Sequence, residues 1–150
     1  MMYKTHVAFG ILIGLLTFDY FNVDKYAFFA AVIFGSIFVD IDEAGSYIGR
    51  RTWPISNLIE YMFGHRGLFH SILLAALIFF VPYHFGYTSI AFGFLIGYLS
   101  HLAADALTID GVRLFYPFSR LSIRGFITTN GLMETIFFVL VLFAIGYVLI

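Results

Sequence analysis

The sequence predicts an all-α membrane protein, a polytopic bundle of about five transmembrane helices plus one short amphipathic helix at the membrane interface. Apolar residues make up 61% of the 150 residues and charged residues 11%, whereas a soluble domain has about 45–50% and about 25%. This is too little charge to cover a soluble surface. Five segments are apolar almost throughout, and no linker or internal repeat separates them. We therefore predict a single integral-membrane domain over residues 1–150.

The five apolar segments are residues 7–21, 26–39, 68–83, 87–107 and 131–150. Lys4, ahead of the first segment, resembles the start of a signal peptide, but no small-x-small cleavage site follows, so we expect a retained helix. The first three segments have only ~15 residues; they suit a thin region of the bilayer, or the first two form a re-entrant hairpin. The last two have the ~20 residues that a span needs.

A short amphipathic helix is expected between the second and third segments. After Trp53 and Pro54, apolar residues recur at helical spacing: Ile55, Leu58, Ile59 and Met62. We predict that this helix lies on the inner membrane surface with Trp53 at headgroup depth. A helix that only caps the bundle fits the same pattern.

Loop charges orient the predicted bundle. An odd-even count of the segments puts seven basic residues on one side and Lys25 alone on the other. The seven are Lys4, Arg50, Arg51, Arg66, Arg113, Arg120 and Arg124. The positive-inside rule then predicts an inner-membrane (plasma-membrane) protein with a cytoplasmic N-terminus and an outer C-terminus.

The composition also excludes several functions. Because the chain has no Cys, it has no disulfide framework, thiol nucleophile or thiolate metal site. Its formal net charge is −1 and no run of like charges occurs, so we expect no nucleic-acid partner. The expected partner is membrane lipid.

The ionisable residues near the apolar segments gather on the predicted cytoplasmic side. They come from four or five different segments and would form one layer of the bundle: His6, Asp40, Asp42, His65, His70, His101, Asp105 and Glu134. Ionisable groups inside membrane segments usually mark functional sites. Asp19, Asp24 and His84 fall on the opposite side, and we expect no site role for them.

The spacing of these residues suits a shared site. His101 and Asp105 are four residues apart, so both project from one helical face. Asp40 and Asp42 straddle the end of the second helix, where two carboxylates can point into one site. His65 and His70 bracket a turn at Arg66-Gly67, in which glycine lets the backbone bend.

Four His and three Asp are too many ligands for one tetrahedral metal. They favour a site for two divalent ions, with zinc first and manganese or iron also fitting. The predicted ligands are His6, Asp40, Asp42, His65, His70, His101 and Asp105. Such a site makes metal-bound hydroxide available and clamps a phosphoryl group. We predict hydrolysis of a phospholipid or lipid-linked phosphate, with Arg66 stabilising charge and Asp42 or Glu134 relaying a proton.

Other interpretations fit the same residues. The cluster could belong to a metal or proton transporter, or to a non-catalytic membrane adaptor that uses a structural metal. His101 and Asp105 could form only a buried hydrogen-bonded pair. In the loop after the fourth segment, Arg113, Arg120 and Arg124 could hold an anionic lipid headgroup or a cytoplasmic phosphate, or only obey the orientation rule.

Four segments carry a resemblance to a known family: Thr5-His6, Val39-Asp40-Ile41-Asp42, His65-Arg66-Gly67-Leu68-Phe69-His70-Ser71, and His101-x-x-x-Asp105-x-x-Thr108-x-x-Gly111-Val112 continuing to Tyr116-Pro117-Phe118. With them the chain resembles the YdjM-like family, described as LexA-binding, inner-membrane-associated metal-dependent hydrolases. Val39 stands where the family usually has Pro, which alters the turn and not a ligand. The resemblance implies a class of activity and no particular substrate.

A looser similarity extends to the zinc-dependent phospholipase C and single-strand nuclease superfamily, whose members hold three zinc ions. It implies that His6, Asp40, His65 or His70, His101 and Asp105 are metal ligands. This chain has one His-x-x-x-Asp motif where those enzymes carry two. We therefore expect two metal ions.

Overall fold

The structure, a computed structural model, describes all 150 residues and is built from helices. The six α-helices are α1 (Tyr3–Thr17), α2 (Lys25–Phe38), α3 (Ile55–Phe63), α4 (Ile72–His84), α5 (Thr88–Ala106) and α6 (Leu132–Val148). Short 3-10 turns adjoin them at η1 (Phe18–Tyr20), η2 (Val39–Asp42), η3 (Gly49–Arg51) and η4 (Leu68–His70). Each apolar segment overlaps one long helix, and α3 occupies the expected amphipathic stretch. The all-α prediction is confirmed.

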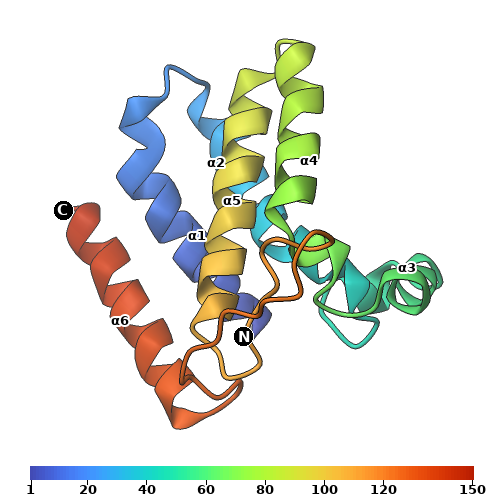
Figure 1. Cartoon of the computed structure of the whole chain (residues 1–150). Coiled ribbons are helices and arrows are strands. Elements are labelled where there is room, and N and C mark those ends of the chain that lie inside the picture. Colours follow the sequence, from blue (N-terminus) through green and yellow to red (C-terminus); the bar gives the residue numbers. More distant parts are fainter.

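Helix α5 is the central element, and it packs against α1, α2 and α4 (Figure 1). Its contact with α2 is close because Gly93 and Gly97 leave space for the facing backbone. A Cβ at Gly93 would overlap the carbonyl oxygen of Phe28, and one at Gly97 would overlap that of Val32. The Gly-x-x-x-Gly spacing thus brings two helix backbones together, as it does in membrane bundles.

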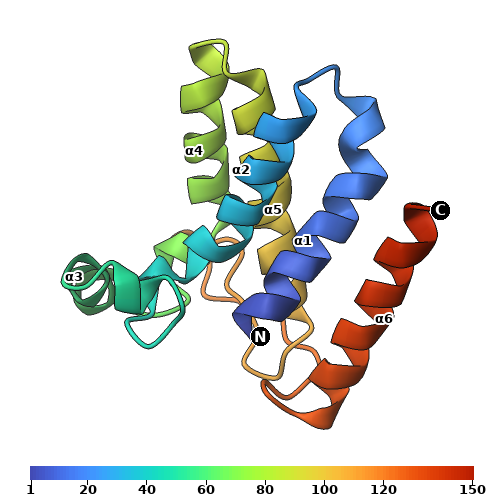
Figure 2. The same ribbon diagram turned by 180° about the vertical axis from the view of Figure 1, so that it is seen from behind.

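The connections separate into two ends. The N-terminus, α3 and the segment between α5 and α6 lie at one end of the bundle, whereas the α1–α2 and α4–α5 connections lie at the other (Figures 1 and 2). Seven basic residues therefore gather at one end, and Lys25, the first residue of α2, lies at the opposite end. The same end receives the predicted layer of ionisable residues. We call it the polar end.

Polar and apolar side chains are distributed unlike those of a soluble protein. Buried residues include three carboxylic acids of the predicted ionisable layer, Asp42, Asp105 and Glu134, and the imidazoles of His6, His70 and His101. Large apolar side chains instead face outward along α4 and α6: Leu77, Phe80, Val81, Leu140 and Phe143. Exposed apolar surface of this extent marks an interaction with lipid or protein.

Helix length departs from the prediction for the last segment. Only α5, with 19 residues, is long and apolar enough to cross a membrane by itself. Helix α6 has 17 residues, or about 26 Å at 1.5 Å per residue, against a hydrocarbon core of about 30 Å. It begins at Leu132, after the turn from Thr128 to Gly131, and ends at Val148, so it lacks one residue of the predicted segment at its start and two at its end. Length and composition thus identify one candidate span, whereas the sequence predicted about five transmembrane helices, two of them of full length.

Helix α3 projects sideways from the polar end of the bundle (Figures 1 and 2). Its polar side chains face the protein: the Ser56 hydroxyl donates to the carbonyl of Ile41 at 2.7 Å, and Glu60 accepts from the backbone N–H of Ala44 at 2.8 Å. Its apolar side chains Leu58 and Met62 are exposed. The helix is therefore docked through its polar face.

Candidate metal centre

Five side chains from four elements meet at the polar end. His6 comes from α1, Asp40 from η2, His70 from η4, and His101 and Asp105 from α5. Two overlapping groups offer ligand atoms within 4.8 Å of one another: His6, Asp40 and His101, and His70, His101 and Asp105. We call these five residues the His/Asp cluster.

The spacing within the cluster suits a metal better than direct hydrogen bonds. The Nε2 atom of His101 lies 3.4 Å from Asp40 Oδ1 and 3.7 Å from Asp105 Oδ2. The Nε2 atom of His70 lies 3.7 Å and 3.5 Å from the same two oxygens. Around a tetrahedral zinc ion with bonds of about 2.0–2.2 Å, ligand atoms lie about 3.3–3.6 Å apart. These separations suit an ion held by His70, His101 and Asp105, and a second group brings Asp40 together with His6 and His101.

The rings of His70 and His101 are also oriented so that Nε2 is free to bind a metal. His101 Nδ1 lies 2.7 Å from the carbonyl oxygen of Ser36, and because that oxygen only accepts, Nδ1 must donate. His70 Nδ1 is 3.1 Å from Asp42 Oδ2 and donates to it in the same way. The Nε2 atoms of both residues are buried with no hydrogen-bond partner. This is how metal-binding histidines are usually oriented, with the second ring N–H held by a carbonyl or carboxylate.

His6 extends the cluster to one side. Its ring stacks on that of His101 with centroids 3.7 Å apart, and its Nε2 lies 3.4 Å from Asp105 Oδ1. Neither of its buried ring nitrogens has a hydrogen-bond partner. The two oxygens of Asp105 therefore face different histidines. The amino group of Met1 also donates to Oδ1, at 2.9 Å.

Asp42 lies behind the cluster. Its buried carboxylate accepts from the backbone N–H of Arg66 at 3.2 Å and contacts His65 Nδ1 at 3.2 Å, in addition to His70. Burial opposes ionisation, but the hydrogen bonds with His65 and His70 lower the pKa of Asp42 below its usual value. The carboxylate therefore faces Nδ1 atoms, whereas Asp40 faces Nε2 atoms. The His65 side chain lies at the margin, with Nε2 3.8 Å from Glu43.

Three carboxylates surround the imidazole of His70. Burial alone would lower the pKa of its imidazole, yet the carboxylates of Asp105, Asp40 and Asp42 raise it well above the usual range. Three carboxylates around one ring attract a proton, and the same negative charges attract a divalent cation. The donor set, the free nitrogens and the charge all fit a metal ion.

Arg66 lies between the cluster and the loop that follows α5. Its Nη2 is 3.5 Å from Asp105, its Nη1 is 3.5 Å from Asp110, and Nη1 donates to the carbonyl of Gly111 at 3.1 Å. The expected bend at Arg66-Gly67 is present: Arg66 has a φ of 59°, and the backbone bends again at Gly67. Glycine is needed at position 67 because a Cβ there would overlap the carbonyl oxygen of Phe63.

Glu134 does not contact the cluster. One of its oxygens accepts from the backbone N–H of Met2 and the other from that of Asn130, both at 2.6 Å. Glu134 thus fastens the start of α6 to the N-terminal segment, and its role as a proton relay stays a prediction. At the far end, Asp24 caps α2 by accepting from Ala27 at 2.8 Å.

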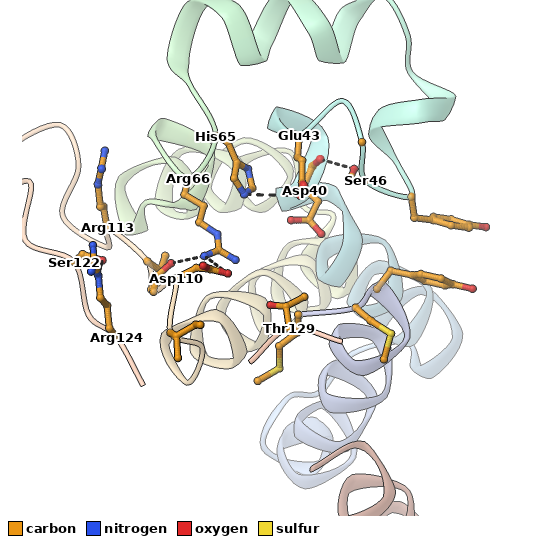
Figure 3. Close-up of a pocket in the computed structure, with 18 of the residues that line it drawn as sticks. Asp40, Glu43, Ser46, His65, Arg66, Asp110, Arg113, Ser122, Arg124 and Thr129 are labelled. Atoms are coloured by element: carbon orange, nitrogen blue, oxygen red, sulfur yellow. Dashed lines mark hydrogen bonds and ion pairs between the residues drawn. The ribbon is translucent and has the colours of Figure 1, made fainter. Parts of the chain in front are cut away.

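A cavity of about 810 Å³ opens beside the cluster (Figure 3). Asp40, His65 and Arg66 line it, together with Asp110 and Glu43. Sequence reasoning gave no site role to Asp110 or Glu43. It also missed Ser36, whose contribution is a backbone carbonyl and leaves no sequence signal. An opening of this size would admit a small-molecule substrate.

Comparisons with known proteins give a consistent family. The family model described as "YdjM inner membrane protein" matches residues 1–150. An uncharacterized protein YvsG of Bacillus subtilis (strain 168) is 33% identical over 115 residues, which cover 76% of this chain and 72% of YvsG. The inner membrane proteins YdjM of Escherichia coli (strain K12) and Shigella flexneri are each 43% identical over 84 residues, which cover 52% of this chain and 43% of theirs. The match therefore spans less than half the length of the two YdjM proteins. No solved structure matches.

Proposed function

The chain belongs to the YdjM inner membrane protein family, and from this premise we propose that it is a membrane-embedded, metal-dependent hydrolase acting on a phosphoester at the cytoplasmic leaflet. One observation carries the proposal. Buried, unpartnered Nε2 atoms of His6, His70 and His101 converge with two carboxylates beside an open cavity. A purely structural site is usually closed, whereas a catalytic site keeps an open position.

The membrane arrangement that we propose has five helices, α1, α2, α4, α5 and α6, in the bilayer and the polar end at the cytoplasmic surface. The family description, the outward apolar side chains of α4 and α6, and the seven-to-one distribution of basic residues support it. Helices shorter than the hydrocarbon core are accommodated by local thinning of the bilayer. The His/Asp cluster would then lie near headgroup depth, which favours a phospholipid or lipid-linked phosphate as substrate.

The His/Asp cluster would hold the metal, and zinc is favoured because three of the five residues are histidines. We propose two ions, because Asp105 presents one oxygen towards His70 and His101 and the other towards His6. When bound, the metal supplies a Lewis acid and lowers the pKa of water to near ~7.

The chain's own residues position and neutralise the substrate. Arg66 places its guanidinium at the cavity wall beside Asp105, where it can stabilise negative charge on a phosphoryl group. Asp42 holds the His70 ring, and the Ser36 carbonyl holds the His101 ring, so neither ring has to turn when metal binds. Both contacts keep the site preorganised.

The test is metal content followed by activity, on the detergent-purified full chain. We expect about two equivalents of zinc or manganese, lost in Asp105→Ala and retained in His84→Ala, whose histidine lies at the far end. Hydrolysis of phosphoester lipids should be lost in His101→Ala and kept in His84→Ala. Folded wild-type protein that takes up no metal would refute the proposal, as would equal activity in the two histidine variants.

A further inference from the structure

Basic residues are concentrated around the cavity. The chain has eight Lys and Arg residues, and five of them line this one opening: Lys4, Arg50, Arg66, Arg113 and Arg124. The other three, Lys25, Arg51 and Arg120, do not. The orientation rule alone accounts for basic residues at the polar end but not for their convergence on one cavity.

Most of this positive charge is not neutralised within the protein. Arg66 is paired with Asp105 and Asp110, but none of the other four basic residues forms an ion pair with a carboxylate. Arg50 donates to the carbonyl of Ser46, and Arg124 contacts the hydroxyl of Ser122, at 3.3 Å and 3.4 Å. Unpaired cations around a cavity attract and concentrate an anionic ligand.

The backbone places Arg113 and Arg124 on the same face. Val112 and Ile123 form an antiparallel bridge with two reciprocal hydrogen bonds of 2.9 Å. Residues next to a bridge pair point to the opposite face from it. Val112 is buried in the core, so Arg113 and Arg124 turn away from the core, and both line the cavity. Arg120 is outside this bridge.

Gly111 connects Arg66 with the pair Arg113 and Arg124. Arg66 donates to the carbonyl of Gly111. Gly111 has a φ of 72°, and a Cβ at this position would overlap the Cγ atom of Arg124. Figure 3 shows the resulting order along the cavity. Arg113 and Arg124 lie at one end, the Arg66–Asp110 pair follows, and His65 and Asp40 lie beyond it. The cavity therefore has two cationic positions: Arg66 next to the cluster, and Arg113 with Arg124 further out.

We propose that the cavity recognises a diphosphate, with the terminal phosphate beside the cluster and Arg66 and the second phosphate between Arg113 and Arg124. The first position rests on the proposed function; the second stands on the unpaired arginines. Guanidinium groups suit this role because their planar forks bind phosphate oxygens in pairs. A monophosphate at the cluster would leave Arg113 and Arg124 without a counterion.

The reaction that follows is hydrolysis of a lipid-linked diphosphate to the lipid monophosphate and orthophosphate. A bond forms between the water oxygen and the terminal phosphorus, and the bond from that phosphorus to the bridging oxygen breaks. Both protons of the water remain on the phosphate products. The second phosphate stays attached to the lipid, held by the outer arginine pair.

The test measures binding without turnover. Zinc-loaded full-length protein in detergent is titrated by calorimetry with methylenediphosphonate, whose P–C–P link cannot be hydrolysed, and with orthophosphate. We expect the diphosphonate to bind at least about 10-fold more tightly, which corresponds to about 1.4 kcal/mol. The Arg113→Gln/Arg124→Gln variant should lose this preference while its orthophosphate affinity changes little. Arg120→Gln, in the same loop, should keep it.

Equal affinity of the wild-type protein for the two ligands would overturn the inference, as would an unchanged preference in the double variant. If the double variant misfolds, the single Arg113→Gln variant, which changes an exposed side chain, must lower the preference. Farnesyl diphosphate in detergent micelles distinguishes a lipid-linked ligand from a soluble one. If it binds more tightly than methylenediphosphonate, the ligand is a lipid diphosphate; if the two bind equally, the ligand is a soluble diphosphate. Diphosphonate binding without any hydrolysis would refute the proposed function and the reaction above, and would leave the recognition of a diphosphate by Arg113 and Arg124 standing.

Discussion

The imidazoles of His70 and His101 each use their two nitrogens for different purposes. In His101, Nδ1 donates to the Ser36 carbonyl and Nε2 faces the carboxylates of Asp40 and Asp105. In His70 the corresponding Nδ1 partner is Asp42. At the scale of single residues the site is therefore two layers deep, with ligand atoms inside and orienting acceptors behind them. A substitution in the outer layer should have a smaller effect than one in the inner layer.

Replacing Asp42 by Asn tests this difference. The amide removes the negative charge and leaves too few acceptor positions for His65, His70 and the Arg66 backbone together. We expect zinc affinity to fall about 10–100-fold, whereas Asp105→Ala abolishes binding. Competition with a chelating dye measures the zinc dissociation constant. Asp19→Asn, an exposed acid at the far end, is the matched control, and an Asp42→Asn affinity equal to that of the control would contradict the orienting role.

The sequence pattern could place Asp40 and Asp42 near the site but could not assign their roles. Both were predicted as ligands, because a helix end can point two carboxylates in one direction. The chain instead forms the 3-10 turn η2 there. With about three residues per turn, side chains two positions apart point in different directions, so Asp40 faces Nε2 atoms and Asp42 faces Nδ1 atoms. That choice depends on the turn type, which the sequence does not reveal.

Among the elements, α5 links packing to the site. Gly93 and Gly97 set its distance from α2, and one turn later His101 reaches back to the Ser36 carbonyl of α2. Asp105 follows four residues further along the same face. The close approach of the two helices and the orientation of the His101 ring therefore depend on one another.

Gly97→Ala should destabilise the protein, because the added Cβ would overlap the carbonyl oxygen of Val32 in α2. Overpacking of this kind costs about 1–3 kcal/mol. The thermal unfolding midpoint in detergent measures the loss. Gly146→Ala in α6 is the control, since a Cβ there meets nothing within 4 Å, and alanine favours a helix over glycine. If both variants unfold at the wild-type temperature, the α2–α5 contact does not limit stability.

Helix α3 has its own test, because Trp53 just ahead of it is the chain's only tryptophan and is 68% exposed. If the outward apolar face of α3 lies in the headgroup region, lipids brominated near the headgroup should quench Trp53 fluorescence strongly, and lipids brominated near the chain end should quench it weakly. The Leu58→Asp variant should reduce the quenching. Emission typical of water with no quenching in either lipid would show that α3 only caps the bundle.

Helical periodicity and apolar runs predicted which segments become helices, including α3. Their lengths were less accessible, because helix ends depend on local hydrogen bonds. Helix α4 starts at Ile72, after the Ser71 hydroxyl accepts from Leu74 at 3.3 Å, four residues beyond the apolar segment's first residue. The sequence also could not distinguish Arg113 from Arg120. Arg113 lines the cavity and Arg120 does not, because only Arg113 adjoins the Val112–Ile123 bridge.

At the scale of the whole molecule, charge and apolar surface are segregated along the bundle. The polar end carries the His/Asp cluster, the cavity and seven of the eight basic residues. The remainder presents apolar side chains outward. This division gives a membrane protein one energetically preferred orientation, because basic loops are retained in the cytoplasm. In the membrane arrangement that we propose, a substrate would reach the cavity from the cytoplasmic leaflet.

The orientation can be tested directly because the chain has no cysteine, so every introduced thiol is unique. Asn22→Cys lies between α1 and α2 at the far end, and Arg120→Cys lies in the loop at the polar end; both positions are exposed. With a membrane-impermeant maleimide added to intact spheroplasts, we expect Asn22→Cys to be labelled at once and Arg120→Cys only after the membrane is permeabilised. The reverse order would place the cluster and its cavity on the outer side. In that case the substrate would have to come from the outer leaflet, while the metal chemistry of the cluster would be unchanged.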